Sequence, residues 1–463
     1  MAEQFDVVVV GGGPGGYAAA LYAAGAGLSV ALVEKDKVGG TCLHRGCIPA
    51  KEFLETASVF RTVAGAREFG VQAEQPAVDF SVSQQRKQRV VNQLWKGLQG
   101  LLKRRKVTMV VGTGELVANR RVRVSDGTEL VGRHVVLATG SAPRTLPGFD
   151  VDGRLVLTSD EMLSLDRLPG SAAVIGGGAI GCEFASLLSD LGVRVTILEA
   201  LPKLLPGCDS DVVDVVAKSF DKRGIDVRLG VQVTGHTPIQ GGGTAVAFGE
   251  GEQLKVDMVV VSVGRRPLSE GLLGDGTAVE LDERGFVRVD EYGRTGEPGV
   301  FAIGDVVATP QLAHVGFAEA IVAVKAMLGQ EPVPVDYMRV PWCIYTYPEV
   351  AFAGLSEQAA REAGFDVVAK KDAFAGNGRA LILGEPEGLV KVIAERGPGG
   401  SAGRILGVHM VGPWVTEQLG QAYLAVNWEA TPDEVANYIQ PHPTLSEVFG
   451  ETVLALTGRG LHL

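Results

Sequence analysis

Cysteine is scarce in this chain, which has five cysteines in 463 residues: Cys42, Cys47, Cys182, Cys208 and Cys343. So few thiols in so long a chain do not form the disulfide framework of a small secreted protein. A zinc site is not indicated either, because zinc takes four ligands and no second Cys/His pair lies at a suitable spacing. We therefore expect neither a disulfide-stapled fold nor a bound metal.

Long apolar runs are also missing. No run approaches the length of a membrane span, and the first residues carry no basic, apolar leader. Positive charge is in deficit, since 43 Lys and Arg residues against 54 Asp and Glu residues give a net charge of −11. That balance argues against non-specific nucleic-acid binding. We expect a cytoplasmic protein with neither a membrane nor a nucleic acid as partner.

Glycine, by contrast, is abundant. The 63 glycines are expected where several Gly-rich loops approach ligands. The hydrophobic fraction of 46% and the charged fraction of 21% are those of an ordinary globular protein. Because 463 residues are too many for one core, we expect three domains, or two domains and an appendage.

Two of the cysteines stand in an unusual segment, GGTCLHRGCIPAK, which spans residues 39–51. On a regular helix, the Cα atoms of Cys42 and Cys47 would be about 8–9 Å apart, whereas a disulfide needs them within about 7 Å. A bond between them therefore requires a distorted first turn, which Gly46 and Pro49 would allow. Such a strained, accessible disulfide exchanges electrons readily. The alternative is two free thiols that pack as small hydrophobic groups.

A nucleotide-binding pattern precedes this segment. Phe5–Val10 is a short apolar run typical of a buried parallel strand, and Gly11-x-Gly13-x-x-Gly16 follows at once. An Ala-rich helix and a second strand then lead to Glu34. Such glycines allow the backbone to approach a pyrophosphate at a helix N-terminus, and the acid can accept ribose hydroxyls. In this setting the motif predicts a dinucleotide site.

The same pattern recurs in the middle of the chain. The strand 172–175 leads into Gly176-x-Gly178-x-x-Gly181, and the strand 193–198 ends at Glu199. The first glycine and the acid are 23 positions apart in both copies (34 − 11 and 199 − 176). Beside the paired cysteines, the repeat predicts FAD in the first unit and NAD in the second. Glu199 favours NAD over NADP, because a carboxylate bonds a free 2′-hydroxyl and repels a 2′-phosphate.

The segment 39–51 resembles the redox-cysteine signature of the pyridine nucleotide–disulfide oxidoreductases. Ile48-Pro49 followed by Lys51 is most similar to the members that oxidise dihydrolipoamide, and the resemblance covers essentially the whole chain. It implies a redox disulfide between Cys42 and Cys47. It also implies an α/β fold with two Rossmann-like dinucleotide-binding domains, the NAD domain inserted in the FAD domain, and a C-terminal α+β dimerisation domain.

Four segments follow from this resemblance and from the change of pattern along the chain. We expect the FAD domain over 1–149 and 269–337, the NAD domain over 150–268 and the dimerisation domain over 338–463. Segments 344–350 and 404–409 resemble parts of the last domain. Between the two dinucleotide units, an amphipathic helix is expected over 84–106, with one apolar face: Val91, Leu94, Trp95, Leu98, Leu101 and Leu102.

The resemblance assigns cofactor-binding residues position by position. Asp305, in the strand-end motif Val300–Asp305, is expected to bond the ribityl chain of FAD, although a turn or cap is the alternative. The full expected set for FAD is Gly11, Gly13, Pro14, Gly15, Gly16, Glu34, Lys35, Gly40, Thr41, Lys51, Thr139, Gly140, Asp305, Ala313 and His314. The expected set for NAD is Gly176, Gly178, Ile180, Gly181, Glu199 and Gly264.

A histidine near the C-terminus resembles the family's catalytic base. His442 and Glu447 match the histidine–glutamate dyad that exchanges a proton with the substrate thiol, in the family from the other subunit of a homodimer. The chemistry needs a base, because only a thiolate attacks a disulfide. Thr444-x-x-Glu447 also fits a capping box, so Glu447 could cap a helix instead, or do both. Lys51 and Glu183 resemble a pair beside the flavin; a surface charge is the alternative for each.

The departures from the family pattern are few. Ala50 stands where serine is usual, Gln440-Pro441 precede His442 where a His-Ala pair is common, and Tyr347 stands where histidine is frequent. None removes a group that the reaction needs. Cys182, Cys208 and Cys343 belong to no motif and are expected to be structural.

The resemblance implies a homodimeric enzyme that oxidises dihydrolipoamide to lipoamide and reduces NAD⁺ through Cys42, Cys47 and FAD. Lipoyl groups, such as the lipoyl domains of a 2-oxo acid dehydrogenase or glycine cleavage complex, are the implied partners. One alternative is a related NAD(P)H-dependent reductase of another small or protein disulfide. A non-enzymatic alternative is a structural subunit of a multienzyme complex.

Overall fold

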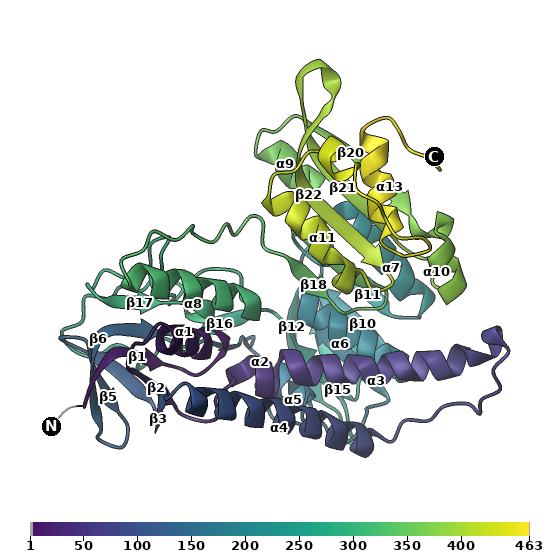
Figure 1. The fold of residues 1–463 in the computed structure, drawn as a ribbon. Coiled ribbons are helices and arrows are strands. Elements are labelled where there is room, and N and C mark those ends of the chain that lie inside the picture. Colours follow the sequence, from purple (N-terminus) through teal and green to yellow (C-terminus); the bar gives the residue numbers. More distant parts are fainter. Residues whose placement is uncertain (1–2, 463) are drawn as a thin grey trace.

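Strand β1 (Glu3–Val10) forms the centre of the first sheet in the computed structural model, which describes residues 3–462 (Figure 1). Its last four valines are buried on both faces, as in a strand covered on each side. The strand order is β3-β2-β1-β6-β5-β4, and β17 pairs with β6. The other strands are β2 (Val30–Glu34), β3 (Thr108–Val111), β4 (Gly114–Val117), β5 (Arg121–Val124), β6 (Glu129–Leu137) and β17 (Val300–Ala302).

Two helices pack together on this first sheet, α1 (Pro14–Gly25) and α8 (Ala313–Met327). Gly15 and Gly316 make the close approach possible, since a Cβ at Gly316 would lie 3.3 Å from the Gly15 nitrogen. The N-terminus of α1 and the short turn η2 (Gly304–Val306) therefore lie at the same edge of the sheet, where β1 and β17 end.

The second sheet repeats the arrangement of the first. Its order is β11-β10-β9-β15-β8, entirely parallel, with β9 (Ser171–Ile175) in the place of β1 and β10 (Arg194–Glu199) in the place of β2. The remaining elements are α5 (Ser159–Met162), α6 (Ala179–Asp190), α7 (Ser210–Lys222), β8 (Val156–Leu157), β11 (Asp226–Leu229) and β15 (Met258–Val261). A three-stranded antiparallel sheet accompanies it: β12 (Val233–Pro238), β13 (Thr244–Phe248) and β14 (Glu252–Val256).

The chain enters and leaves the second unit through one two-stranded sheet. Strand β7 (Ser141–Pro143) pairs antiparallel with β16 (Arg265–Pro267), so the segments on either side of the insertion lie together. We propose that the domain boundaries at 149/150 and 268/269 fall beside these strands, and the boundary at 337/338 ahead of the last sheet. The boundaries themselves stay a prediction.

Three helices connect the first two units: α2 (Gly40–Arg45), α3 (Cys47–Gly65) and α4 (Phe80–Arg104), with the turn η1 (Ala66–Phe69). Helix α4 starts earlier than the expected 84–106, because Asp79 caps it by accepting from the Ser81 and Val82 amides. Val91 and Leu102 are buried as predicted, but Leu94 is exposed. Leu94 lies off the stripe that residues 91, 95, 98 and 102 form at a 3.6-residue period, which explains the error.

The C-terminal part is an antiparallel sheet covered by helices, in the order β18-β19-β22-β21-β20. The segment 344–350 contains a turn between β18 (Trp342–Ile344) and β19 (Glu349–Gly354), and 404–409 lies within β22 (Ala402–Gly412). The other elements are α9 (Glu357–Glu362), β20 (Val367–Ala373), η3 (Phe374–Gly376), α10 (Gly378–Leu383), β21 (Leu389–Arg396), η4 (Pro398–Gly400), α11 (Val415–Asn427), α12 (Pro432–Val435) and α13 (Glu447–Leu456). Among residues 3–462, no helix combines the length and apolarity that a bilayer span requires.

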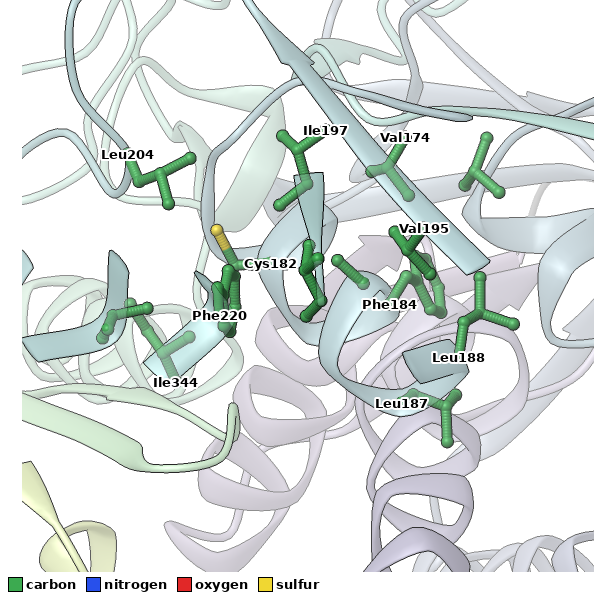
Figure 2. Packing of buried hydrophobic residues seen from close by; sticks show 14 of the residues in the cluster. Val174, Cys182, Phe184, Leu187, Leu188, Val195, Ile197, Leu204, Phe220 and Ile344 are labelled. Carbon is green, nitrogen blue, oxygen red and sulfur yellow. The ribbon is translucent and has the colours of Figure 1, made fainter. Parts of the chain in front are cut away.

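One apolar core joins the second unit to the C-terminal sheet. Figure 2 shows Phe220 of α7 beside Ile344 of β18, and both belong to the cluster that also contains Cys182. The core continues into α3 through Phe53 and Ala57. The helix that carries Cys47 is therefore packed against the second nucleotide unit, and its position follows from that core.

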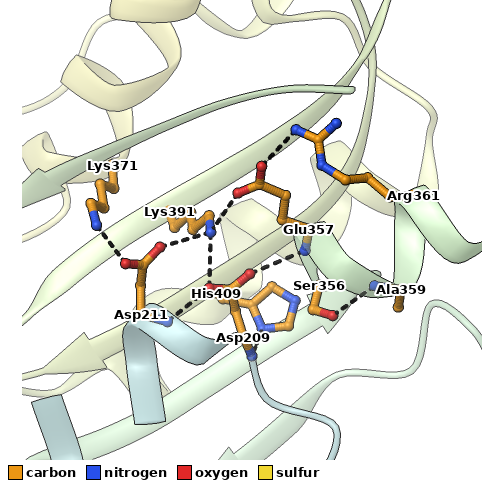
Figure 3. A network of polar contacts seen from close by, with 9 residues as sticks. All are labelled: Asp209, Asp211, Ser356, Glu357, Ala359, Arg361, Lys371, Lys391 and His409. Atoms are coloured by element: carbon orange, nitrogen blue, oxygen red, sulfur yellow. Dashed lines mark hydrogen bonds and ion pairs between the residues drawn. The ribbon is translucent and has the colours of Figure 1, made fainter. Parts of the chain in front are cut away.

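A buried ionic network reinforces the same junction (Figure 3). The Lys391 ammonium, from β21, lies 3.0 Å from Asp209, 2.8 Å from Asp211 and 2.8 Å from Glu357. Although burial opposes it, the bonds from Lys391 and from the Glu357 amide hold the pKa of Asp209 below its usual value. His409 on β22 is fully buried and accepts from the Asp209 amide at Nδ1. Since an unpaired buried charge is costly, these groups fix how α7 meets the last sheet.

We predict that His409 makes the protein less stable as the pH falls from about 6.5 to about 4. Burial lowers the pKa of His409 to about 4, so the unfolded chain binds a proton in this window and the folded chain does not. As the pH decreases through this window, the free energy of unfolding decreases by up to about 1.4 kcal/mol per pH unit. Denaturant unfolding at several pH values measures the slope. His409→Gln should flatten it, while His462→Gln, at an exposed histidine, should keep it. An unchanged slope in His409→Gln contradicts the prediction.

Candidate functional site

The redox segment forms two helices with a break between them. Helix α2 ends at Arg45, Gly46 has φ −149° and ψ −113°, and α3 begins at Cys47. The distortion that a Cys42–Cys47 bond would require is therefore present as an interruption at Gly46. Cys47 occupies the first position of α3, where the positive end of the helix dipole favours a thiolate.

The two thiols are free in this structure. The neighbouring Cys47 sulfur and burial raise the pKa of the Cys42 thiol. The neighbouring Cys42 thiol and the Lys51 ammonium lower the pKa of Cys47. Cys47 is exposed and Cys42 is half-buried. The pair therefore has one sulfur that ionises readily and one that stays protonated.

The redox segment is docked on the first glycine loop. The Gly39 amide donates to the Gly12 carbonyl at 2.8 Å. Gly40 has φ +58°, and a Cβ there would lie 2.6 Å from the Gly13 Cα. Only glycine fits at such a position. The cysteines are thus held next to the turn that the sequence predicts for a pyrophosphate.

The first glycine loop leaves an open cradle. A Cβ at Gly16 would lie 1.8 Å from the Gly11 carbonyl oxygen, whereas one at Gly13 would meet nothing within 4 Å. Gly16 is therefore needed for packing, and Gly13 leaves room at the start of α1. Glu34 is held in place, because its carboxylate accepts from the Gly12 amide at 2.7 Å and the Asp36 amide at 2.8 Å.

The second glycine loop has the same geometry. A Cβ at Gly181 would lie 1.9 Å from the Gly176 carbonyl oxygen, and one at Gly178 would meet nothing within 4 Å. Glu199 accepts from the Gly177 amide at 2.5 Å and from the Leu201 amide at 2.7 Å. In both units the space over the central glycine, at a helix N-terminus, fits a pyrophosphate. The chain can therefore hold two dinucleotides.

The predicted Lys51–Glu183 pair is formed. The Lys51 ammonium donates to both carboxylate oxygens of Glu183 at 2.8 Å, from α3 to α6. The Tyr345 amide also donates to Glu183, and the Tyr345 ring lies 4.7 Å from the ammonium. Sequence reasoning missed Tyr345, because nothing local connects it with a residue 162 positions away.

Asp305 lies in η2, and two unpredicted residues hold it. The Ser141 hydroxyl donates to the Asp305 carboxylate at 2.5 Å, and the Arg265 Nε donates to the same hydroxyl at 2.7 Å. Ser141 is on β7 and Arg265 on β16, so the hinge of the inserted unit contacts this carboxylate directly. Their adjacency to Gly140 and Gly264 was the available signal in the sequence.

The other expected cofactor residues lie around the same two loops. Thr139 donates to the Leu268 carbonyl at 2.7 Å, and the Leu268 amide donates to Gly140. Ala313 begins α8, as predicted, while His314 is exposed and bonds the Pro341 carbonyl at 2.8 Å. The rest occupy the ends of elements: Pro14 and Gly15 at the start of α1, Lys35 after β2, Thr41 in α2, Ile180 in α6, and Gly264 before β16.

His442 and Glu447 form a dyad at the other end of the molecule. His442 Nδ1 lies 2.7 Å from the Glu447 carboxylate, which also accepts from the Thr444 amide at 2.7 Å. Only the glutamate half of the capping box is formed: the Glu447 carboxylate accepts from the Thr444 amide, whereas the Thr444 hydroxyl donates to the Pro441 carbonyl. Figure 1 shows α13 beside the C-terminal sheet, well apart from α2. Within residues 3–462, no hydrogen bond joins His442 to the redox segment.

The remaining cysteines are packed rather than reactive. Cys182 and Cys208 are buried, and burial raises the pKa of each. Burial also raises the pKa of the Cys343 thiol to about 11. These environments suit the structural role expected from the sequence.

Comparisons of sequence identify the family. The profile described as "Pyridine nucleotide-disulphide oxidoreductase" matches residues 5–320, and the profile of the dimerisation domain of that family matches residues 340–453. The chain belongs to the pyridine nucleotide–disulfide oxidoreductases. The predicted fold class is confirmed, and the family's cofactors, FAD and NAD, are those predicted from the two glycine motifs.

The relatives and neighbouring structures cover nearly the whole chain. A dihydrolipoyl dehydrogenase of Bacillus subtilis is 41% identical over 478 residues and is covered completely, as is this chain. One of Chlorobaculum parvum is 38% identical, covering 98% of this chain and 97% of its own. LpdA from Mycobacterium tuberculosis superposes with a TM-score of 0.90 at 26% identity, covering 98% and 100% of the two chains. The Cu(II) complex of the HOCl-induced flavoprotein disulfide reductase RclA from Escherichia coli superposes with a TM-score of 0.87 at 27% identity. The match covers 98% of this chain and 99% of that chain.

We predict that Lys51→Met raises the pH at which Cys47 becomes alkylated by iodoacetamide in the reduced protein. Loss of the ammonium removes a charge that favours the thiolate, so the midpoint should rise by about one unit or more. Mass spectrometry of the cysteine peptides across a pH series measures it. Lys87→Met, at a lysine on α4, should leave the midpoint unchanged, and unmodified Cys182 reports an intact fold. An unmoved midpoint in Lys51→Met contradicts the prediction.

Proposed function

We propose that this chain oxidises dihydrolipoamide to lipoamide and reduces NAD⁺. The observation that carries the proposal is the Cys42–Cys47 pair at the break between α2 and α3, held against the first glycine loop. The relatives named dihydrolipoyl dehydrogenase match from end to end. Two dinucleotide cradles and a thiol pair are the parts that such a reaction needs.

The thiol chemistry is assigned to three residues. With Cys42 and Cys47 joined as a disulfide, His442 takes a proton from one substrate thiol, and the thiolate attacks the Cys42 sulfur. The bond between Cys42 and Cys47 breaks, and Cys47 leaves as the thiolate. The second substrate thiol then displaces Cys42 and passes its proton to the Cys42 sulfur, so that lipoamide departs as the oxidised product and two electrons remain on the cysteines. The lowered pKa of Cys47 supports this order.

The cofactor assignments follow the two loops. We assign FAD to the first cradle with Glu34 and Asp305, and NAD to the second with Glu199. Bound FAD would accept the electron pair from the cysteines and pass it to NAD⁺. The Lys51 ammonium, held in place by Glu183, favours the thiolate form of Cys47.

A homodimer completes the proposed site. The match of residues 340–453 to the family's dimerisation domain supports this. The His442 side chain is 79% exposed. Helix α13, which begins at Glu447, lies apart from α2 in Figure 1. We infer that His442 serves the cysteines of a second copy. Large apolar side chains exposed in the same part fit such a contact: Leu381, Ile382, Trp414, Leu424, Trp428 and Ile439.

A second candidate is the reduction of another disulfide, favoured by the likeness to the flavoprotein disulfide reductase of Escherichia coli. It uses the same residues in the opposite direction. Lipoyl domains as partners and a cytoplasmic location belong to the first proposal. Parallel assays with dihydrolipoamide and NAD⁺, and with glutathione disulfide and NADPH, separate the candidates. A purely structural subunit would be active in neither.

We predict that His442→Gln lowers the turnover of dihydrolipoamide by about 10²- to 10⁴-fold, because the substrate thiol loses its base. Cys47→Ser should abolish it. Steady-state assays of NADH formation measure both. His462→Gln, which alters a similarly exposed histidine paired with Glu451, should keep the full rate. Normal turnover by Cys47→Ser would refute the route through the cysteines.

We also predict that the impaired variants His442→Gln and Cys47→Ser complement each other. In a mixed dimer, the subunit with His442→Gln has intact cysteines and receives an intact His442 from the Cys47→Ser subunit. After dissociation and reassociation of the two preparations together, activity should exceed the sum of the separate preparations. Mixed dimers as inactive as their parents would show that each chain supplies its own base.

The choice of nicotinamide cofactor is predicted to rest on Glu199. Glu199→Ala should raise the KM for NAD⁺ at least about tenfold, since a charged hydrogen bond contributes about 1.5–3 kcal/mol. The same change should reduce the preference of the protein for NAD⁺ over NADP⁺. Kinetics with both cofactors measure this. Glu34→Ala, the matching change in the first unit, should weaken FAD retention instead. A KM unaffected by Glu199→Ala contradicts the assignment.

A further inference from the structure

Glu319 is a buried carboxylate that the proposed chemistry does not use. It lies on α8, and the residue is 5% exposed. Its Oε2 accepts from the Gly304 amide at 2.6 Å, and its Oε1 accepts from the Tyr337 hydroxyl at 2.9 Å. One carboxylate thus joins three separate parts of the chain: α8, the turn η2 and the segment that leads to the last sheet.

The turn that Glu319 holds contains Asp305. Gly304 has φ +70°, a conformation that gives the turn its sharp bend, and its amide points to α8 rather than into the sheet. From the hinge strands, the Ser141 hydroxyl donates to the Asp305 carboxylate, and Arg265 donates to that hydroxyl. The direction of this carboxylate is therefore set both by its own hydrogen bond and by the turn that Glu319 holds.

We infer that Glu319 is a positioning residue for FAD, acting through the Gly304 amide on Asp305 and kept in place by Tyr337. The inference rests on the proposed FAD site. No contact between Glu319 and the cofactor is required, since its carboxylate is already occupied by two donors.

The surroundings make these bonds hard to replace. Burial raises the pKa of Glu319 above its usual value, while the bond from Gly304 opposes that rise. Beside it, a cavity of about 10 Å³ lined by Ile303, Glu319 and Tyr337 has room for at most one water. Without an acceptor on α8, the Gly304 amide would be buried and unpaired, so the turn would rearrange to reach solvent.

An acceptor, rather than a negative charge, is what the turn needs. A glutamine offers one amide oxygen to Gly304 and can donate its NH₂ to the Tyr337 oxygen. Leucine has a similar volume and offers neither bond. Glu319→Gln and Glu319→Leu therefore separate the hydrogen bonds from simple filling of space.

The test measures the binding of FAD to the apo-protein, and the change in flavin fluorescence reports the binding. Glu319→Leu should raise the Kd for FAD at least tenfold, Glu319→Gln should stay within threefold of the unaltered chain, and Tyr337→Phe should lie between them. Glu161→Leu is the matched control, because Glu161 also accepts from one backbone amide and one hydroxyl, both of Thr158. It should lower the unfolding temperature without changing the Kd.

The outcomes are distinct. The inference is overturned if Glu319→Leu binds FAD as tightly as the unaltered chain does. It is also overturned if Glu319→Gln and Glu319→Leu weaken FAD binding by the same factor. If Glu319→Leu does not fold, an unchanged Kd in Tyr337→Phe overturns it as well. Failure of the unaltered chain to bind FAD at all would instead overturn the proposed function.

Discussion

The ion pair between Lys51 and Glu183 is the contact on which the arrangement of the site depends. Lys51 follows Cys47 by one turn on α3, and Glu183 lies on α6 just after the second glycine loop. A half-buried pair of this kind adds little net stability, but losing one partner leaves a charge without compensation. The pair therefore fixes geometry: it keeps the thiol and the second dinucleotide cradle together. Together with Cys42, the same ammonium lowers the pKa of Cys47, so Lys51 contributes both to the position and to the reactivity of the thiol.

Much of the fold could be predicted because its signals are local. Each glycine fingerprint lies within one strand, one turn and one helix, and its acid ends the next strand, so the pattern survives without knowledge of tertiary contacts. The structure also shows a contact that both acids make without a ligand. The carboxylates of Glu34 and Glu199 accept hydrogen bonds from the amides of Gly12 and Gly177 in the glycine loops. The cysteine segment was equally readable, because its spacing conflicts with a regular helix and Gly46 resolves the conflict.

What the sequence could not provide are pairings between distant residues. Ser141 with Asp305, Tyr345 with Glu183 and Lys391 with Asp209 each join elements more than 150 positions apart. A pattern can also be satisfied in part. Thr444-x-x-Glu447 forms the glutamate half of a capping box, because the Glu447 carboxylate accepts from the Thr444 amide. The threonine hydroxyl bonds Pro441 instead, and the same carboxylate also bonds His442. A motif specifies which bonds are available, and the tertiary path decides which of them form.

The proposed division of the site between two chains fits the chemistry proposed for it. A base that lay permanently against Cys42 would compete with the substrate thiol for the same space, whereas a base on another surface leaves a gap into which a thiol can fit. His442 is suited to this role because Glu447 orients its ring and the Thr444 amide in turn orients Glu447, so the imidazole is fixed although its side chain is exposed. An exposed histidine that is oriented in this way suits a surface that another molecule covers, and the apolar residues exposed in the same part of the chain fit the proposed second copy.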